Sequence, residues 1–69
     1  MITLEQIHNK IVDAIRNSGL TQAEISKRLG IAAPTVSQYI SGRAYPALDT
    51  FANLCEILDL DANDILCIN

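Results

Sequence analysis

The side chains of this 69-residue chain that could do chemistry are hydrogen-bonding and cationic groups between positions 22 and 43. The amide of Gln38 could bond both a donor and an acceptor on an adenine edge, and the hydroxyl of Ser37 could pair with several bases. Lys27, Arg28 and Arg43 carry the positive charge that phosphates attract. This is the chemistry of recognition. The sequence offers no nucleophile with its base, paired-carboxylate cleft, phosphate loop or metal cluster, so we expect no enzyme, no cofactor and no small-molecule ligand.

Two short helices must position these groups, and residues at their ends mark where each begins and stops. Thr21 is a good N-cap, and Glu24 three residues later completes a capping box, so a helix should start at Gln22. Gly30 ends this helix because glycine adopts the left-handed conformation without steric cost. A second helical pattern runs from Ala32 to Ser41, with a proline in its first turn, where a missing N–H does no harm.

The apolar residues of these two segments lie at helical spacing and can pack against each other. Ile25 and Leu29 lie four apart in the first segment, and Val36 and Ile40 lie four apart in the second, with Tyr39 beside them. The residues left to face outward on the second segment are Ala33, Pro34, Ser37 and Gln38. The spacing is close to what a DNA-reading helix-turn-helix requires.

Residues at fixed offsets also carry a family resemblance. They are the TQAEI opening, the small Ser26, Gly30 at the turn, apolar Ile31 and Val36, and the Ser41-Gly42 pair after the second segment. With these features the chain resembles the lambda-repressor-like family of Cro-type and XRE-type transcriptional regulators. The stretch GRAYPALDTFANLCEILDLDANDIL is similar to the family's loop, fourth helix and short fifth helix, so the resemblance covers almost the whole chain. It implies one all-α domain over residues 1–69, a five-helix bundle that binds double-stranded DNA sequence-specifically and represses transcription.

The resemblance also implies site residues by position. Base contacts in the major groove fall to Ala33, Pro34, Ser37 and Gln38, and backbone contacts to Gln22, Lys27, Arg28, Thr35, Ser41 and Arg43. Ala33 and Pro34 depart from the family because they bring neither donor nor acceptor and can touch only thymine methyls. We therefore expect an A·T-leaning site that is read partly through DNA shape. In a second departure, Ile15 and Ile40 stand where the family often pairs an Arg with a Glu.

Three further helices complete the expected bundle. The first runs from about Thr3 to Ser18 and the fourth from about Leu48 to Leu58, while Tyr45-Pro46 stops the helix between them. A last short helix should span Ala62 to Leu66, capped by Asp61, with Asp64 able to complete a capping box. The residues expected to face inward are Leu4, Ile7, Ile11, Ala14 and Ile15 in the first helix and Leu48, Phe51, Leu54, Cys55 and Leu58 in the fourth.

The charge of the chain stands against a DNA partner, since DNA-binding domains are expected to be basic and this one has a net charge of −3. All five cations lie in residues 1–48, which carry a formal +2, whereas residues 49–69 carry five carboxylates and a formal −5. If the protein binds DNA, the acidic end should point away from it. The alternative is that these carboxylates form an ordinary solvated surface.

A domain this small would bind DNA weakly alone, so we expect a homodimer. Ile57, Ile65 and Ile68 form the candidate dimer patch, although Leu66 beside them could equally fold onto the first and fourth helices. The alternative function is a protein-interaction module, such as an antitoxin or adaptor that has lost DNA binding. The apolar Ala33-Pro34 pair and the negative net charge favour that alternative.

The remaining residues predict structural roles. Cys55 should lie in the core, and the two cysteines are too far apart in sequence to suggest a metal site. His8 should be a surface or half-buried imidazole, and Tyr39 and Tyr45 should be packing residues. Short apolar runs and the absence of a signal-peptide layout predict a cytoplasmic protein without a membrane span.

Overall fold

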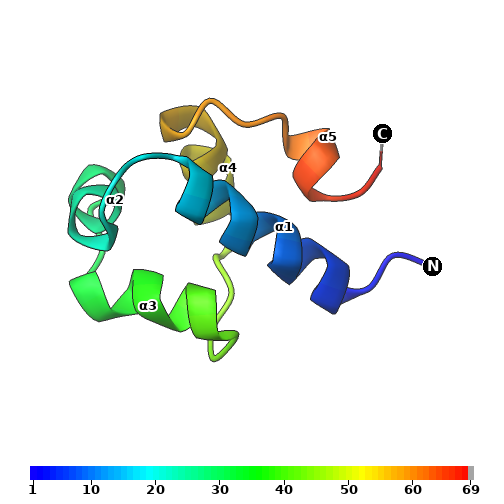
Figure 1. Cartoon of the computed structure of the whole chain (residues 1–69), viewed down its shortest axis with the longest axis horizontal. Coiled ribbons are helices and arrows are strands. Elements are labelled where there is room, and N and C mark those ends of the chain that lie inside the picture. Colours follow the sequence, from blue (N-terminus) through cyan, green and yellow to red (C-terminus); the bar gives the residue numbers. More distant parts are fainter. Residues whose placement is uncertain (69) are drawn as a thin grey trace.

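The computed structural model describes residues 1–68, which form five helices. They are α1 (Leu4–Asn17), α2 (Gln22–Leu29), α3 (Ala33–Ser41), α4 (Leu48–Ile57) and α5 (Ala62–Ile65). In Figure 1, α1 runs across the middle, α3 lies below it, and α4 and α5 lie above it. Both termini lie at the right end of this view. Each helix ends within one residue of its predicted bounds, so the predicted all-α, five-helix architecture is confirmed.

Side chains cap the starts of α1 and α2 in the same way. The Glu24 N–H donates to Thr21 Oγ1 at 3.1 Å, and the Thr21 N–H donates to Glu24 Oε1 at 3.0 Å. Thr3 and Gln6 form the equivalent box at the start of α1. These reciprocal bonds satisfy N–H groups that have no partner inside the helix, which is why each helix starts where it does.

A glycine turn separates α2 from α3. Gly30 adopts the left-handed conformation, with φ of +69°, and its N–H donates to the Lys27 carbonyl at 3.3 Å. The Ile31 N–H donates to the Ser26 carbonyl at 3.0 Å. Two bonds of this kind around a left-handed glycine make a Schellman motif, so the turn closes α2 and redirects the chain into α3.

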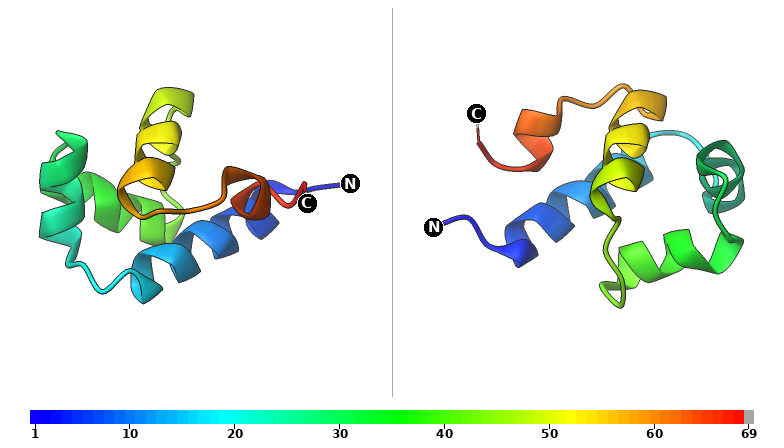
Figure 2. Two further views of the ribbon diagram at one scale, coloured as in Figure 1. Left: turned by 90° about the horizontal axis from the view of Figure 1, so that it is seen from above. Right: turned by 180° about the vertical axis from the view of Figure 1, so that it is seen from behind.

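The core joins all five helices. Its buried cluster consists of Ile11, Ile15, Ile25, Val36, Leu54 and Ile65. Ile25 of α2 and Val36 of α3 are both fully buried, so the two helices of the turn motif are fixed by their inner faces. Tyr39 and Cys55 are buried as predicted, and burial raises the pKa of both side chains. Figure 2 shows α4 packed behind α1, where it closes the core above α3.

Two expectations about individual residues were wrong. Leu48 was expected to face inward, but it is 89% exposed, and Leu4 is exposed as well. Both are the first residue of a helix, and at a helix end the periodic apolar face extends beyond the neighbours that would cover it. Val12 lies outside the predicted stripe of α1 and is nevertheless buried.

Two carboxylates lie at the start of α5. Asp61 is the N-cap, as predicted, and its carboxylate accepts from the Asn63 N–H at 3.0 Å. The carboxylate that was expected to complete a capping box, that of Asp64, lies 3.6 Å from Lys10 Nζ on α1. The ion pair joins α5 to α1 across an exposed surface, where such pairs contribute little stability.

The described residues occupy about 33 × 24 × 21 Å. Every helix in residues 1–68 is too short or too polar to cross a bilayer.

Candidate nucleic-acid interface

One face of α3 is exposed along its whole length. Ala33, Pro34, Ser37 and Gln38 all lie on it and are exposed, as the helical spacing predicts. The opposite face carries Val36 and Tyr39, which are buried. Because residues three and four apart share a helix face, the four outward side chains form one strip that the core holds from behind.

The two ends of this strip differ in chemistry. Ala33 and Pro34 at the N-terminal end can make only apolar contacts, whereas Ser37 and Gln38 bring a hydroxyl and an amide. The N-cap of α3 is Ala32, which makes no side-chain cap hydrogen bond. The N-terminal end of α3 therefore leaves backbone N–H groups without a side-chain acceptor from the cap residue.

The C-terminal end of α3 carries two of the expected backbone-contact residues. Ser41 and Arg43 are both exposed, and Gly42 between them ends the helix with φ of +81°. Ser41 Oγ donates to the Gln38 carbonyl at 3.1 Å, and so does the Arg43 N–H at 3.0 Å. The backbone of Arg43 is therefore hydrogen-bonded to Gln38, the residue whose side chain carries the amide of the strip.

On α2 the expected contact residues lie at opposite ends. Gln22, the first residue, is exposed beside the capping box, and Lys27 and Arg28 are exposed in the last turn. A hydrogen bond with the backbone N–H of Thr21, and a smaller effect of the Thr21 hydroxyl, hold the pKa of Glu24 below its usual range. Thr35 on α3 is half-buried, and its N–H donates to the Ala32 carbonyl at 3.0 Å.

A family model described as helix-turn-helix, of the XRE or lambda-repressor-like type, matches residues 12–65. The match covers α2, α3, α4 and α5 completely and the C-terminal part of α1. The chain belongs to this helix-turn-helix family. Members of the family are DNA-binding regulators. No curated protein and no solved structure that was compared gives a significant match.

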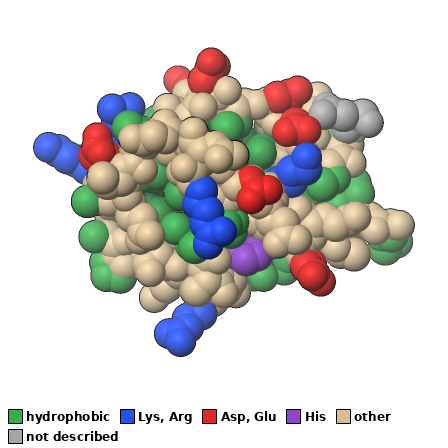
Figure 3. Space-filling model, viewed as in Figure 1, with side chains coloured by type: hydrophobic (Ala, Val, Ile, Leu, Met, Phe, Trp, Pro, Cys, Tyr) green, Lys and Arg blue, Asp and Glu red, His purple; other side chains and the backbone are tan. Residues whose placement is uncertain are grey.

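Charge on this helix-turn-helix protein is distributed unevenly in space as well as along the chain. In Figure 3 several acidic side chains lie along the upper edge, over α4 and α5, and others lie at the left end, in the middle of the face and at the lower right. Lys and Arg side chains stand out at the end formed by α2 and below the end of α3. The acidic side chains over α4 and α5 thus lie on the opposite side of α1 from α3 in this view, whereas Asp49 at the start of α4 lies near enough to Tyr39 of α3 to add to the effect of burial in raising the pKa of that side chain.

The three residues expected at a dimer interface lie in different environments. Ile65 is 4% exposed and belongs to the core, and Ile57 is half-buried against that core, so neither side chain presents much surface to a partner. Ile68 is 56% exposed. Leu66, for which packing onto the bundle was an equal expectation, helps to line an apolar groove of about 180 Å³ with residues of α1 and α4.

That groove opens where large apolar side chains are exposed. Leu4, Tyr45 and Leu48 line it and are exposed. Figure 3 shows apolar side chains at the end of the molecule where both termini lie in Figure 1. We refer to Leu4, Tyr45 and Leu48 as the terminal apolar patch. The sequence did not reveal the patch, because the pattern of apolar residues does not show which helix ends lie beyond the core.

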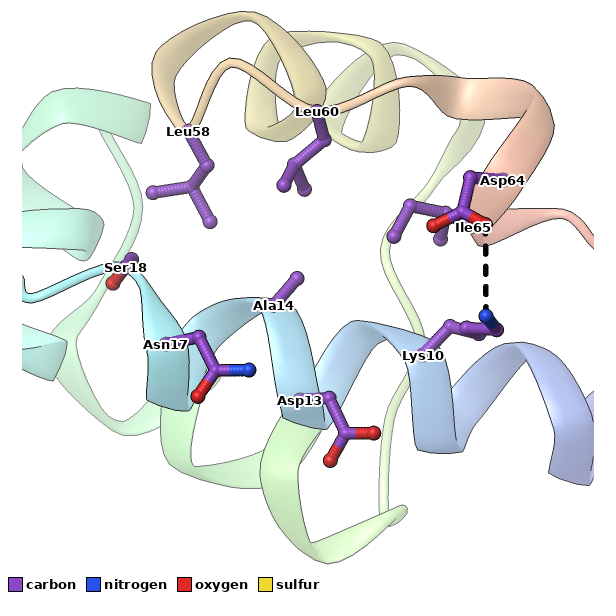
Figure 4. Close-up of a pocket in the computed structure, with 9 residues that line it drawn as sticks. All are labelled: Lys10, Asp13, Ala14, Asn17, Ser18, Leu58, Leu60, Asp64 and Ile65. Atoms are coloured by element: carbon purple, nitrogen blue, oxygen red, sulfur yellow. Dashed lines mark ion pairs between the residues drawn. The ribbon is translucent and has the colours of Figure 1, made fainter.

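A second groove, of about 340 Å³, separates α1 from the segment that joins α4 to α5. Figure 4 shows Leu58, Leu60 and Ile65 pointing toward Ala14, so the floor is apolar. Its rim is polar and includes the Lys10–Asp64 ion pair. Among residues 1–68 no group of three or more His, Cys, Asp or Glu side chains is arranged to hold a metal ion.

Sequence reasoning missed the contact of His8 with the end of α3. The ring is half-buried, as one of its two expected environments required, but its Nε2 lies within hydrogen-bond distance of two carbonyls at the end of α3. The contact joins residues 31 and 32 positions apart, so no local pattern signals it.

Proposed function

We propose that this chain is a sequence-specific, double-stranded-DNA-binding transcriptional repressor that inserts α3 into the major groove. The observation that carries the proposal is the exposed strip Ala33, Pro34, Ser37 and Gln38, backed by a fully buried Val36. A helix held rigidly from behind with one free face can enter a groove that is about 12 Å wide. The chain would act as one domain over residues 1–69, in the cytoplasm, where it meets DNA.

In this proposal the strip reads bases unevenly. Gln38 pairs bidentately with an adenine, Ser37 adds a less specific hydrogen bond, and Ala33 and Pro34 touch thymine methyls. Since half of the strip is apolar, the preferred site leans toward A·T pairs, and DNA shape contributes part of the selectivity.

Backbone contacts would fix the register of the strip on the duplex. The residues with this role are Gln22, Lys27, Arg28, Thr35, Ser41 and Arg43. Arg43 is the central cation, because it follows α3 directly and its backbone is bonded to Gln38. Phosphate contacts of this kind supply affinity without sequence information.

The experiment selects bound duplexes from a random pool and compares two variants on the selected and a random duplex. Gln38→Ala is expected to lose about 1–3 kcal/mol of discrimination between the two duplexes. Arg43→Ala is expected to weaken both duplexes alike and to reduce the salt slope by about one. Lys10→Ala is the matched control, since it removes the same charge from the rim of the groove beside α5.

An equal loss from Gln38→Ala on both duplexes would remove Gln38 from base reading. A salt slope that Lys10→Ala reduces as much as Arg43→Ala does would contradict the proposed docking face.

We further propose that the protein binds DNA as a homodimer through the terminal apolar patch. The patch lies beside the end of α3, since Tyr45 follows that helix by four residues. In such a dimer the two-fold axis has to place both α3 helices on one side, because two half-sites about 34 Å apart require it. Of the residues originally expected in the interface, Ile68 remains and Ile57 and Ile65 would play at most a supporting part.

Sedimentation at several concentrations tests the dimer. Leu48→Lys should give a monomer, while Ala52→Lys, an equal change at another exposed position of α4, should leave the dimer intact. A wild-type chain that stays monomeric with and without its selected duplex would refute this assembly.

The second candidate function is a protein-interaction module, such as an antitoxin or adaptor. Two features favour it: the strip carries no donor at Ala33 or Pro34, and a large apolar patch is exposed elsewhere. Failure to bind any duplex at low salt would make this the preferred function.

A further inference from the structure

The carbonyl groups at the end of α3 are not satisfied in the same way as those of α2. In α2 the N–H of Gly30 donates to the carbonyls of both Lys27 and Ser26, three and four residues back. In α3 the N–H of Gly42 donates to the carbonyl of Gln38, four residues back. The Tyr39 carbonyl, which corresponds to that of Lys27, therefore needs a donor from elsewhere, because a helix end leaves its last carbonyls unpaired.

The side chain of His8 on α1 supplies that donor. Its Nε2 lies 3.0 Å from the Tyr39 carbonyl oxygen and 3.1 Å from that of Ile40. A carbonyl oxygen can only accept, so Nε2 has to carry the proton and donate to the pair. One imidazole thus bonds the two carbonyls that directly follow Gln38 in the chain.

The same ring also contacts the loop after α3. The ring of Tyr45 meets it edge to face, with centroids 5.9 Å apart and an interplanar angle of 83°. A side chain on Gly42 would place its Cβ 3.5 Å from the imidazole, so the glycine backbone passes close to the ring. His8 therefore touches both the end of the helix and the loop on either side of Arg43.

The backbone of Gln38 is held from two directions as a result. Its own carbonyl accepts from the N–H groups of Arg43 and Ala44 and from Ser41 Oγ. The next two carbonyls are bonded to α1 through His8. A rotation or shift of α3 relative to α1 would break the two bonds of His8.

We propose that His8 is a positioning residue for DNA reading: its Nε2–H fixes the end of α3 and the Arg43 loop against α1, and so sets the direction of Gln38. The proposal rests on the proposed function, since positioning matters only if Gln38 reads bases. Loss of the bond should therefore reduce discrimination between DNA sequences more than it reduces general attraction to DNA.

Three variants test this on the selected and the random duplex. His8→Phe keeps a ring against Tyr45 and removes the donor, His8→Gln keeps an amide donor, and Asn9→Ala is a control at an exposed position of α1. The ratio of the two affinities is the readout, because a smaller folded fraction lowers both affinities equally and leaves the ratio unchanged. We expect His8→Phe to reduce the ratio about tenfold, His8→Gln to restore most of it, and Asn9→Ala to leave it unchanged. An unchanged ratio in His8→Phe overturns the proposal, and so does a loss that His8→Gln does not restore.

The hydrogen bond itself can be observed without DNA. In wild-type protein, long-range ¹H–¹⁵N correlations of the neutral His8 ring should show the proton on Nε2, and a proton on Nδ1 would overturn the proposed bond. If wild-type protein binds no duplex, the proposed function fails while this spectrum still reports the bond, so the two failures are distinguishable.

Discussion

The two helices of the turn motif are stabilised in different ways. The start of α2 has a complete capping box, and its end has both bonds of a Schellman motif. The start of α3 has no side-chain cap. At its end the N–H groups of Gly42 and Arg43 both donate to the Gln38 carbonyl, and a histidine from another helix bonds the two carbonyls that follow. The ends of α2 are therefore stabilised by its own local sequence, whereas α3 also depends on the rest of the bundle.

This difference suits a helix that has to meet another molecule. Side chains that cap a helix cover its end, and the N-terminal end of α3 is the part that would enter a groove. Leaving Ala32 without a capping group costs some stability, and the buried faces of Val36 and Tyr39 offset that cost. In the structure α3 is held by its inner face and its C-terminal end.

The largest expected effect comes from removing the packing that both helices share. Ile25→Ala should lower the free energy of unfolding by about 2–5 kcal/mol, because Ile25 is the fully buried residue through which α2 joins the core. Chemical denaturation measures the change, and Lys27→Ala on the exposed side of α2 should stay within about 0.5 kcal/mol of wild type. A small loss in Ile25→Ala would mean that local caps, and not the shared core, hold the motif together.

The two N-caps should respond in opposite directions. Thr21→Ala removes a cap and should cost about 1 kcal/mol of unfolding free energy, whereas Ala32→Ser adds one and should gain up to about 1 kcal/mol. The same denaturation experiment measures both variants. Should Ala32→Ser destabilise the protein, the start of α3 would already be satisfied by a partner other than its cap residue.

The smallest effect is a pH dependence of stability that the capping box of α2 has and that of α1 lacks. The capping box of α2 uses Glu24, whose folded pKa lies below the ordinary value of 4.5, whereas that of α1 uses the neutral Gln6. A lowered folded pKa contributes stability above the ordinary pKa, and that stability is lost as the pH falls through the folded pKa. Wild-type protein should therefore lose more stability than Glu24→Gln when the pH falls below 4.5. Parallel curves for wild-type protein and Glu24→Gln, measured by denaturation at each pH, would count against this role for Glu24.

Local sequence predicted the helix boundaries well because short-range hydrogen bonds set them. Thr21, Gly30 and Gly42 each act within four residues of themselves, so their types were enough to place the ends of α2 and α3. Packing at the helix ends was harder to predict. Leu48 is exposed and Ile65 is buried because the position of neighbouring helices, and not the spacing of apolar residues, decides which side chains the core covers.

The candidate site was predictable to the same extent. The outward strip of α3 follows from helical spacing, and the exposure of its four residues was predicted in full. The link from His8 to α3 crosses 31 residues of chain and depends on the three-dimensional path of α1. No composition or local motif carries that information.

The central claim is that α3 and its flanking cations bind DNA, and the dependence of wild-type affinity on salt tests it most directly. Titration of the selected duplex over a range of salt concentrations should give a negative slope of log affinity against log salt, with about 0.9 for each phosphate contacted. The random duplex should bind more weakly by about a thousandfold or more. Binding that is absent at low salt, or an affinity that does not change with salt, would contradict the account.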